Sequence, residues 1–215
     1  MVLSSRHLSK IICVLLYLTT TPFLVSMAST ITDNTSTPSL QSAGKGFISP
    51  ITRYTAFKYQ RGFLAGFQGG WHLTNRLTIG AGIYRLITDV ELGKSQNAAG
   101  EEMPLLLKFG YRGLLFEYGL GQIKSSKIFA NAVVGQGKVG LGEESDDYKE
   151  DSFYLVEPGM RIEFNPWPNL TLGLGLNYRY VFGSELIGLK DPHLRDVSGL
   201  VEFRLEDLNY WFGGK

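Results

Sequence analysis

The chain has 215 residues, with 44% hydrophobic residues, 13% aromatic residues and a formal net charge of +1. This length suits one domain of ordinary size, and the near-neutral charge gives no reason to expect nucleic acid as a partner. Glycine is abundant, at 26 residues, and no segment is long and apolar enough to be a plain membrane helix. Abundant glycine together with many aromatic residues is more typical of β-barrels than of helical proteins.

The N-terminal segment has the pattern of a secretory signal peptide. Arg6 and Lys10 precede an apolar stretch over 11–25, and a small-x-small pattern ends at Ala28. We therefore predict export and cleavage after Ala28. An uncleaved membrane anchor is the alternative, although the apolar stretch is short for one. The single cysteine, Cys13, lies in this segment, so the mature chain is expected to have no thiol and no disulfide.

A Ser/Thr-rich stretch without hydrophobic periodicity follows the signal. Such a composition cannot bury enough apolar surface to fold and predicts disorder. From these changes along the chain we predict three segments, which are a signal peptide over 1–28, a disordered lead-in over 29–45 and a β-barrel over 46–215.

The remainder of the chain alternates apolar and polar residues with a period of two, which predicts strands with two different faces. The clearest case is LTLGLGLNYRYV over 170–181, where leucines and then tyrosines share one face. This strand is long for a soluble protein, and its tyrosine end suggests a bilayer-crossing strand. We predict eight strands, over 51–59, 63–73, 77–90, 105–118, 128–141, 153–164, 170–181 and 197–205.

Two positions interrupt the regular pattern. The apolar residues of 105–118 change from odd to even numbers at Gly113, and a β-bulge there would produce such a slip. Pro158 has no N–H to give to a neighbouring strand, so it predicts a second bulge or a position at the barrel rim.

The connections alternate between short and long, as expected of a closed antiparallel barrel in an outer membrane, which has short periplasmic turns and longer external loops. The link over 60–62 is the exception, because its position makes it external although it is short. The short connections are 74–76, 121–126 and 165–169, and the long ones are 92–103, 142–152 and 183–196.

Aromatic residues mark both ends of the predicted barrel. In this topology Trp71, Trp167 and Trp211 all fall at the periplasmic end, where an aromatic girdle is expected at the membrane interface. A second aromatic set falls toward the opposite rim and contains Tyr59, Phe63, Tyr84, Tyr154, Tyr178 and Tyr180.

The polar faces of the strands carry both signs of charge in comparable number. The interior of an eight-stranded barrel is only wide enough to be filled by side chains, and charges enclosed there must be paired. We therefore predict a closed ion-pair network in the lumen, with a narrow pore or proton path as the alternative. Its predicted members are Arg85, Lys108, Arg112, Glu117, Glu157, Arg161, Glu163, Arg179, Glu202 and Arg204.

Catalytic and metal-binding motifs are weak. The sequence has no P-loop, no G-x-S-x-G motif and no His/Cys set with zinc spacing, so we expect no catalytic, cofactor-binding or metal-binding residues. His193, with Ser184, Glu185 and Asp191 nearby, is the best candidate for a lipid-modifying enzyme at the rim. The acidic run over 143–147 could attract divalent cations, but such loops are usually only solvated.

Several short motifs, in this order and spacing, are similar to bacterial outer-membrane proteins: GGW at 69–71, IGAGIY at 79–84, VEPG at 156–159 and YRYV at 178–181. Over roughly 46–205 the chain resembles the small eight-stranded outer-membrane β-barrel proteins of Gram-negative bacteria, the class of the OmpA membrane domain and OmpX. The resemblance implies outer-membrane lipid and lipopolysaccharide as partners, and the barrel-assembly machinery during biogenesis. It supplies no shared catalytic residue.

One departure from that class lies at the C-terminus. Such barrels usually end on an aromatic residue that the assembly machinery reads, whereas here the predicted last strand is followed by 206–215. Either 203–205 serves as that signal internally or the last strand extends to Phe212.

We therefore expect a monomeric all-β chain, an up-and-down transmembrane barrel with both termini periplasmic and an ion-paired lumen. Its role would be structural or would lie in surface interactions through the external loops. One alternative is an enzyme that modifies lipopolysaccharide. Another is a soluble exported barrel that binds a ligand, which would need an apolar lumen and a polar exterior.

Overall fold

A computed structural model describes residues 44–96, 102–142, 149–167, 169–184, 186 and 189–207. The predicted cleavage site after Ala28, the acidic run over 143–147, Glu185 and Trp211 lie outside the described residues. No helix in the described part of the chain is long and apolar enough to cross a membrane.

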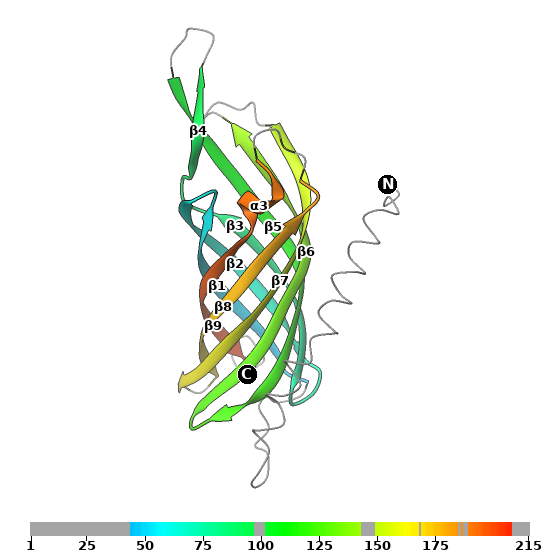
Figure 1. The fold of residues 1–215 in the computed structure, drawn as a ribbon. Helices are drawn as coiled ribbons and strands as arrows, with labels where there is room; N and C mark the ends of the chain where they lie inside the picture. Colours follow the sequence, from blue (N-terminus) through cyan, green and yellow to red (C-terminus); the bar gives the residue numbers. More distant parts are fainter. Residues whose placement is uncertain are drawn as a thin grey trace, which may run out of the picture. The chain divides into compact units, whose positions relative to one another are not determined.

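The described chain forms strands and one short helix, shown in Figure 1. The elements are β1 (Gly46–Phe57), β2 (Gln60–His72), β3 (Leu77–Leu86), β4 (Glu91–Gln96), β5 (Glu102–Ile123), β6 (Ser126–Gly142), β7 (Lys149–Trp167), β8 (Leu170–Phe182), α3 (Asp191–Leu194) and β9 (Asp196–Glu206).

The strands form one closed antiparallel sheet. β1 pairs with both β2 and β9, and β3 pairs with β5, so the sheet has no gap between its first and last strands. Because β3 and β4 both pair with β5, they share one position, which leaves eight positions in the barrel. The predicted eight-stranded up-and-down barrel is therefore confirmed. Closure also removes the exposed strand edges that an open sheet would present.

The strands are longer than predicted on the side of the long connections. The segment over 92–103, predicted to be a loop, instead contains β4 and the start of β5, which pair with each other at Lys94 and Pro104. This hairpin projects beyond the neighbouring strands in Figure 1. The short link between β1 and β2 is a turn at Lys58 and Tyr59, with φ of 44° and 74°. Two successive positive φ values match the right-handed twist of a hairpin, which explains its shortness.

The predicted bulge at Gly113 is wrong. Gly113 pairs in regular register with Gly82 on one side and Gly135 on the other, and the shift lies between Gly119 and Gly121. The apolar pattern changes phase because apolar residues occupy both faces of β5 in turn. Tyr111 faces the interior at 3% exposure, whereas Leu114 faces outward at 58%.

Pro158 does not create a bulge and does not lie at a rim. It stands opposite Ala132 of β6 in the middle of β7. On the β8 side, the pairs Val156–Tyr180 and Gly159–Asn177 keep one register, and no pairing is made at Pro158 between them. The missing N–H therefore costs local pairing with β8 but leaves the register intact.

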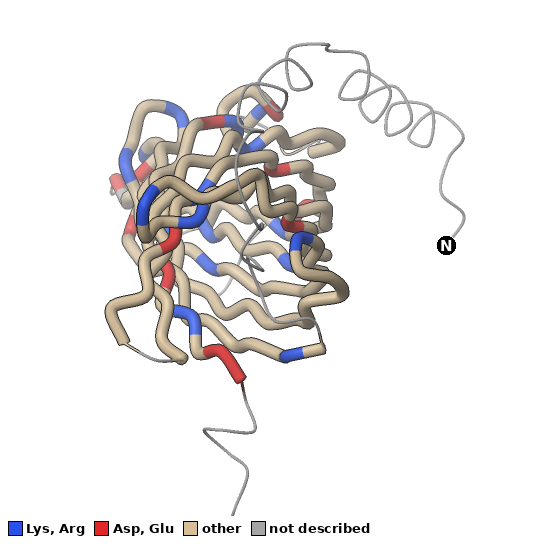
Figure 2. The backbone as a smooth tube through the Cα atoms, turned by 90° about the horizontal axis from the view of Figure 1, so that it is seen from below, with Lys and Arg blue, Asp and Glu red and all other residues tan. Residues whose placement is uncertain are grey.

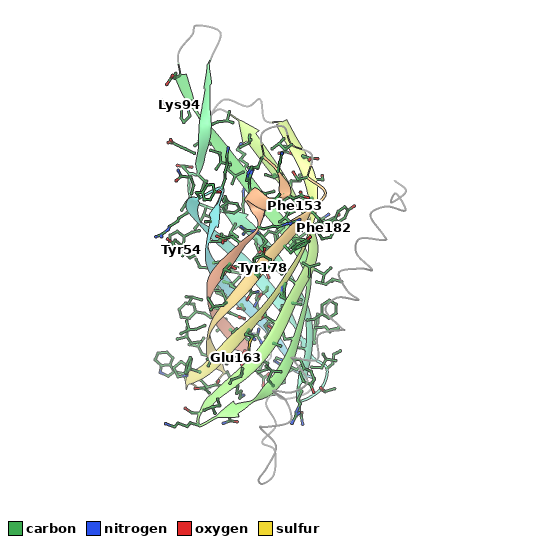
Figure 3. All side chains as sticks on the ribbon, viewed as in Figure 1. Tyr54, Lys94, Phe153, Glu163, Tyr178 and Phe182 are labelled. Carbon is green, nitrogen blue, oxygen red and sulfur yellow. The ribbon has the colours of Figure 1, made fainter. Side chains whose placement is uncertain are left out.

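The two faces of the sheet have opposite character. Large apolar side chains are exposed on the outer face, among them Phe67, Ile83, Leu114, Leu176 and Phe203, each more than half exposed. Tyr54 and Tyr178 lie on the same face (Figure 3). Contiguous exposed apolar surface of this extent marks a membrane or partner interface. A soluble ligand-binding barrel would show the reverse arrangement, with an apolar lumen inside a polar exterior.

Candidate functional site

The interior of the barrel is the candidate site, because most buried charged groups gather there. Both signs of charge lie along the strands of the barrel (Figure 2). Four arginines and four glutamates in the described residues are at most 2% exposed. They are Arg53, Arg161, Arg179, Arg204, Glu117, Glu157, Glu163 and Glu202. The equal numbers keep the buried set neutral.

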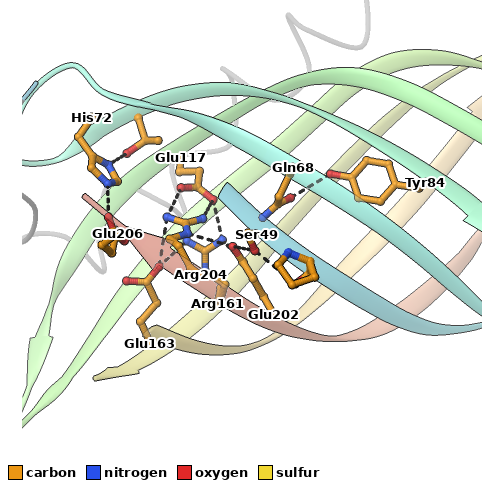
Figure 4. Close-up of polar contacts among 12 residues, drawn as sticks. Ser49, Gln68, His72, Tyr84, Glu117, Arg161, Glu163, Glu202, Arg204 and Glu206 are labelled. Atoms are coloured by element: carbon orange, nitrogen blue, oxygen red, sulfur yellow. Dashed lines mark hydrogen bonds and ion pairs between the residues drawn. The ribbon is translucent and has the colours of Figure 1, made fainter. Parts of the chain in front are cut away.

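A branched ion-pair network fills the end of the interior that is nearer the short turns after β2 and β7, which we call the lower end. Figure 4 shows its contacts. Arg161 on β7 donates to Glu117 at 2.6 Å, to Glu202 at 2.7 Å and to Glu163 at 2.6 Å. Arg204 on β9 donates to the two oxygens of Glu117 at 2.9 and 3.0 Å and to Glu202 at 2.9 Å. Each arginine thus contacts side chains of more than one strand, so the ion pairs link strands across the interior of the barrel.

Arg161 needs room that a neighbouring strand supplies. Gly173 of β8 faces it, and a Cβ at that position would come within 2.9 Å of the Arg161 Cδ. The glycine of the strand is therefore part of the network, because any side chain there would displace the guanidinium.

A second buried pair lies above this network. Arg53 of β1 forms an ion pair with Glu157 of β7, and the hydroxyl of Tyr111 links the two by accepting from Arg53 at 2.8 Å and donating to Glu157 at 2.7 Å. The Arg53 guanidinium lies 4.2 Å from the centre of the Tyr84 ring. Ser198 donates to the other oxygen of Glu157 at 3.2 Å.

The lower end is closed by His72. Its ring stacks on Phe47 at 5.5 Å and lies between Thr78 and Glu206, each 2.8 Å from a ring nitrogen. His72 is 1% exposed, so the imidazole is a packed part of the barrel end.

The upper end is filled by apolar side chains and by α3. Arg179 of β8 anchors the helix, because its Nε donates to the Leu194 carbonyl at 2.7 Å while its Nη2 donates to Thr55 and the Ala56 carbonyl at 3.2 Å. The guanidinium also stacks on Phe57 and Phe109. The buried apolar residues around it include Leu64, Val90, Val139, Phe153, Leu155, Val181, Leu189 and Leu194. Side chains thus fill the described interior at successive levels.

The structure divides the predicted network into two groups. Seven of its residues lie in the interior, namely Glu117, Glu157, Arg161, Glu163, Arg179, Glu202 and Arg204. Six of them form ion pairs, whereas Arg179 makes none within the described residues and donates to carbonyl and hydroxyl oxygens instead. Arg85, Lys108 and Arg112 instead lie exposed on the outer face, the same face as Ile83 of β3 and Leu114 of β5. Placing them in the lumen was wrong. For Lys108 and Arg112, the apparent phase slip at Gly113 put Phe109 and Tyr111 outside and the two basic residues inside, whereas the unbroken register does the reverse. Arg85 shares the odd numbering of the exposed Ile79 and Ile83, so the alternation of β3 by itself places it on the outer face.

Sequence reasoning missed one interior residue and misplaced two others. Arg53 was not assigned to the network, although it shares the numbering parity of the buried Phe47 and Ile51. That parity was the available signal. Tyr111 was assigned to the lipid face, and Tyr84 to the outer rim, but both are buried and stack on each other with ring centres 4.7 Å apart.

Trp71 and Trp167 lie at the ends of β2 and β7 and are 62% and 65% exposed. Both strands end at the turn side of the barrel, so the two indoles share one end. The proposed girdle position of these residues remains a prediction.

The residues considered for a rim enzyme do not form a catalytic arrangement in the described chain. His193 Nδ1 accepts from the Lys190 N–H at 3.2 Å. Asp191 accepts from the backbone N–H of Gly183 and of Ser184, and the Ser184 hydroxyl donates to Asp151 at 3.4 Å. These contacts fold the segment around α3. No group of His, Cys, Asp and Glu that could hold a metal ion occurs among the described residues.

Comparison with protein-family models gives no match, and comparison with curated proteins gives none. Among solved structures, the N-terminal β-barrel domain of OprF from Pseudomonas aeruginosa is similar, with 10% identity, coverage of 77% of this chain and 99% of that one, and a TM-score of 0.52. Neisserial surface protein A matches with 15% identity, coverage of 76% and 95%, and a TM-score of 0.49. OprG, an outer-membrane protein of Pseudomonas aeruginosa, matches with 9% identity, coverage of 78% and 98%, and a TM-score of 0.49.

The OprF domain matches almost throughout its length, and the match spans most of this chain. Together with the closed eight-position sheet, this likeness identifies the architecture. The chain has the fold of the small eight-stranded outer-membrane β-barrels.

Proposed function

We propose that this protein is an integral β-barrel of a bacterial outer membrane, with a filled lumen, whose role is structural or lies in interactions of its loop side. The observation that carries the proposal is the inverted polarity of the barrel. Ion pairs lie inside, and large apolar side chains such as Leu176 and Phe203 are exposed outside. A hydrocarbon surround makes such an exterior stable, while closure satisfies the backbone hydrogen bonds.

The orientation follows from the strand ends. Phe47 of β1 pairs with Glu206 of β9, so the described chain enters and leaves the barrel at the end that carries the short turns. Short turns are periplasmic in this class of protein. The signal-like N-terminal segment supports export. The β4–β5 hairpin and α3 then belong to the cell-surface side.

The filled interior supports a scaffold rather than a channel. Arg161, Arg204 and their glutamates fill the lower lumen, and Leu194 of α3 is fully buried at the upper end. The contacts of His193 and Ser184 hold the segment around α3 in place and support a non-catalytic role. We propose the monomer as the working unit, lipid and lipopolysaccharide as its surroundings, and the barrel-assembly machinery as its partner during biogenesis.

Fractionation and gel migration test the proposal. The full-length protein should appear in the outer-membrane fraction and should migrate differently in unheated and heated gel samples, because a folded barrel resists the detergent until it is boiled. Recovery as a soluble periplasmic protein would contradict the membrane location. A steady single-channel conductance in planar bilayers would contradict the filled lumen.

A further inference from the structure

The outer face of the barrel carries a cluster of basic side chains that the ion-paired interior does not use. Arg85 of β3, Lys108 and Arg112 of β5 and Lys138 of β6 are all exposed on this face. We refer to these four residues as the outer cationic cluster. They lie on three neighbouring strands and on the loop side of apolar residues such as Leu114.

The cluster surrounds a position without a side chain. Gly110 of β5 pairs with Arg85 on one side and with Lys138 on the other. Lys108 and Arg112 stand two residues before and after Gly110 on the same strand. With a strand spacing of about 4.8 Å and a rise of about 3.3 Å per residue, the Cα atoms form a diamond of about 10 by 13 Å. A group larger than one phosphate can lie between these four cations.

The surface is hollowed at this place. A hollow of about 840 Å³ is lined by all four basic residues and also by Gln136, while Asp89 and Glu150 contribute carboxylates. A second hollow of about 430 Å³ shares Arg112 and Gln136 with the first and continues over Ala81, Leu114 and Val134. One end of this surface is therefore charged and the other apolar, which suits an amphiphilic molecule.

The cations of the cluster are only partly satisfied by the protein. Lys138 forms an ion pair with Glu150 at 2.9 Å, with both side chains more than half exposed. The side chains of Arg85 and Arg112 have no hydrogen bond or ion pair within the described part of the chain. The interior arginines contrast with them, because Arg161 and Arg204 each contact three glutamates.

We propose that the outer cationic cluster binds the phosphorylated headgroup of lipopolysaccharide, with acyl chains lying along the apolar hollow over Leu114 and Val134. The inference rests on the proposed membrane location. Guanidinium groups bind phosphate through paired charge-assisted hydrogen bonds, and basic groups at a membrane surface attract anionic lipid. Tyr154, which shares a cross-strand row with Arg112 and Gln136, is the kind of aromatic residue that lies at headgroup level.

The test measures lipid binding by the full-length protein purified from membranes in detergent. The probes are lipid A with two phosphates and its dephosphorylated form, detected on the protein by native mass spectrometry. The double variant Arg85→Gln/Arg112→Gln should bind the phosphorylated probe roughly tenfold to thirtyfold more weakly. Binding by the unaltered protein should also weaken as salt increases.

A matched control removes two cations elsewhere on the loop side. Arg61 of β2 and Lys94 of β4 are exposed, and neither lines the two hollows. Arg61→Gln/Lys94→Gln should leave lipid A binding within about twofold, a difference small on the scale of one surface charge. Heat-modifiable migration of both double variants should match the unaltered protein, which separates loss of the site from loss of folding.

Equal binding by the two double variants would overturn the cluster as the site. Equal binding of the dephosphorylated probe, or displacement of lipid A by inorganic phosphate at the same concentration as by lipid A itself, would overturn a lipid headgroup as the ligand. Failure of the proposed membrane location would show in fractionation instead, because binding in detergent does not depend on where the protein resides.

Discussion

Arg161 of β7 and Arg112 of β5 are the same residue type in one sheet, yet they lie in opposite surroundings. Arg161 is 2% exposed in the interior and donates to three glutamates. Arg112 is exposed on the outer face and has no side-chain partner within the described residues. An enclosed charge needs an ion pair or hydrogen bonds from the protein, because burial removes its water. An exposed charge keeps its water and remains available to a ligand. The face of the strand therefore decides whether an arginine stabilises the barrel or can bind.

The largest expected effect tests the difference between the buried and the exposed arginine, each of which is replaced by leucine. Arg161→Leu should destabilise the folded barrel by about 3–5 kcal/mol, because three buried glutamates lose a shared partner. Urea unfolding in lipid vesicles would measure the free energy. Arg112→Leu is the matched control and should change stability by less than about 0.5 kcal/mol. Equal losses in the two variants would mean that burial of the network does not govern stability.

A second prediction tests whether the apolar outer face lies in hydrocarbon. Leu174 is 44% exposed and lies in the part of β8 that is nearer the short turns. Leu174→Arg should destabilise the protein in lipid vesicles by about 2–4 kcal/mol if the position lies deep in hydrocarbon. The same measurement on Gln136→Arg, beside the outer cationic cluster, should give a loss of about 1 kcal/mol or less at the interface. A tolerated arginine at position 174 would argue against a hydrocarbon-facing exterior.

The Arg53–Glu157 pair gives a smaller expected effect. Glu157→Gln keeps the shape of the side chain and can still hydrogen-bond to Tyr111 and Ser198, but it leaves Arg53 without its carboxylate. We expect a loss of about 2–3 kcal/mol in the free energy of unfolding. The double variant Arg53→Met/Glu157→Gln should recover part of this loss, because it also removes the unpaired cation. A double variant less stable than the single one would exclude that explanation.

The smallest effect on stability is expected for Arg179, the interior arginine that holds α3 at the loop side of the barrel. Arg179→Ala removes the donors to the Leu194 and Ala56 carbonyls. Since each bond contributes about 0.5–1.5 kcal/mol, α3 should exchange its amide hydrogens faster, while the lower ion-pair network stays protected. Thr55→Val removes only one of the three acceptors of Arg179 and should produce a weaker change in the same measurement. Uniformly faster exchange throughout the barrel would show that Arg179 supports the whole fold.

Much of the fold could be predicted from local pattern. Strand β8 was predicted over 170–181 and runs from Leu170 to Phe182, because only one of its faces is apolar and the alternation is unambiguous. Strand β5 was less predictable, since Phe109 and Tyr111 are apolar residues of the interior while Leu114 is an apolar residue of the exterior. A change from one apolar face to the other looks the same in sequence as a bulge.

The sequence by itself determined a chain of alternating strands, enough to specify a closed barrel and all four of the buried glutamates in the described residues. Only the tertiary structure decided which face the charges of β5 occupy, and so separated Lys108 and Arg112 from the buried network. The physical reason is that alternation fixes two faces but not which of them is enclosed. That choice is made by the register across neighbouring strands, which moves every side chain of a strand to the opposite face when it shifts by one residue. In β8 the leucines and tyrosines share one face, so only one assignment of the enclosed face fits its sequence. Around Gly110 of β5 either face could be the enclosed one, and pairing with the neighbouring strands decides between them.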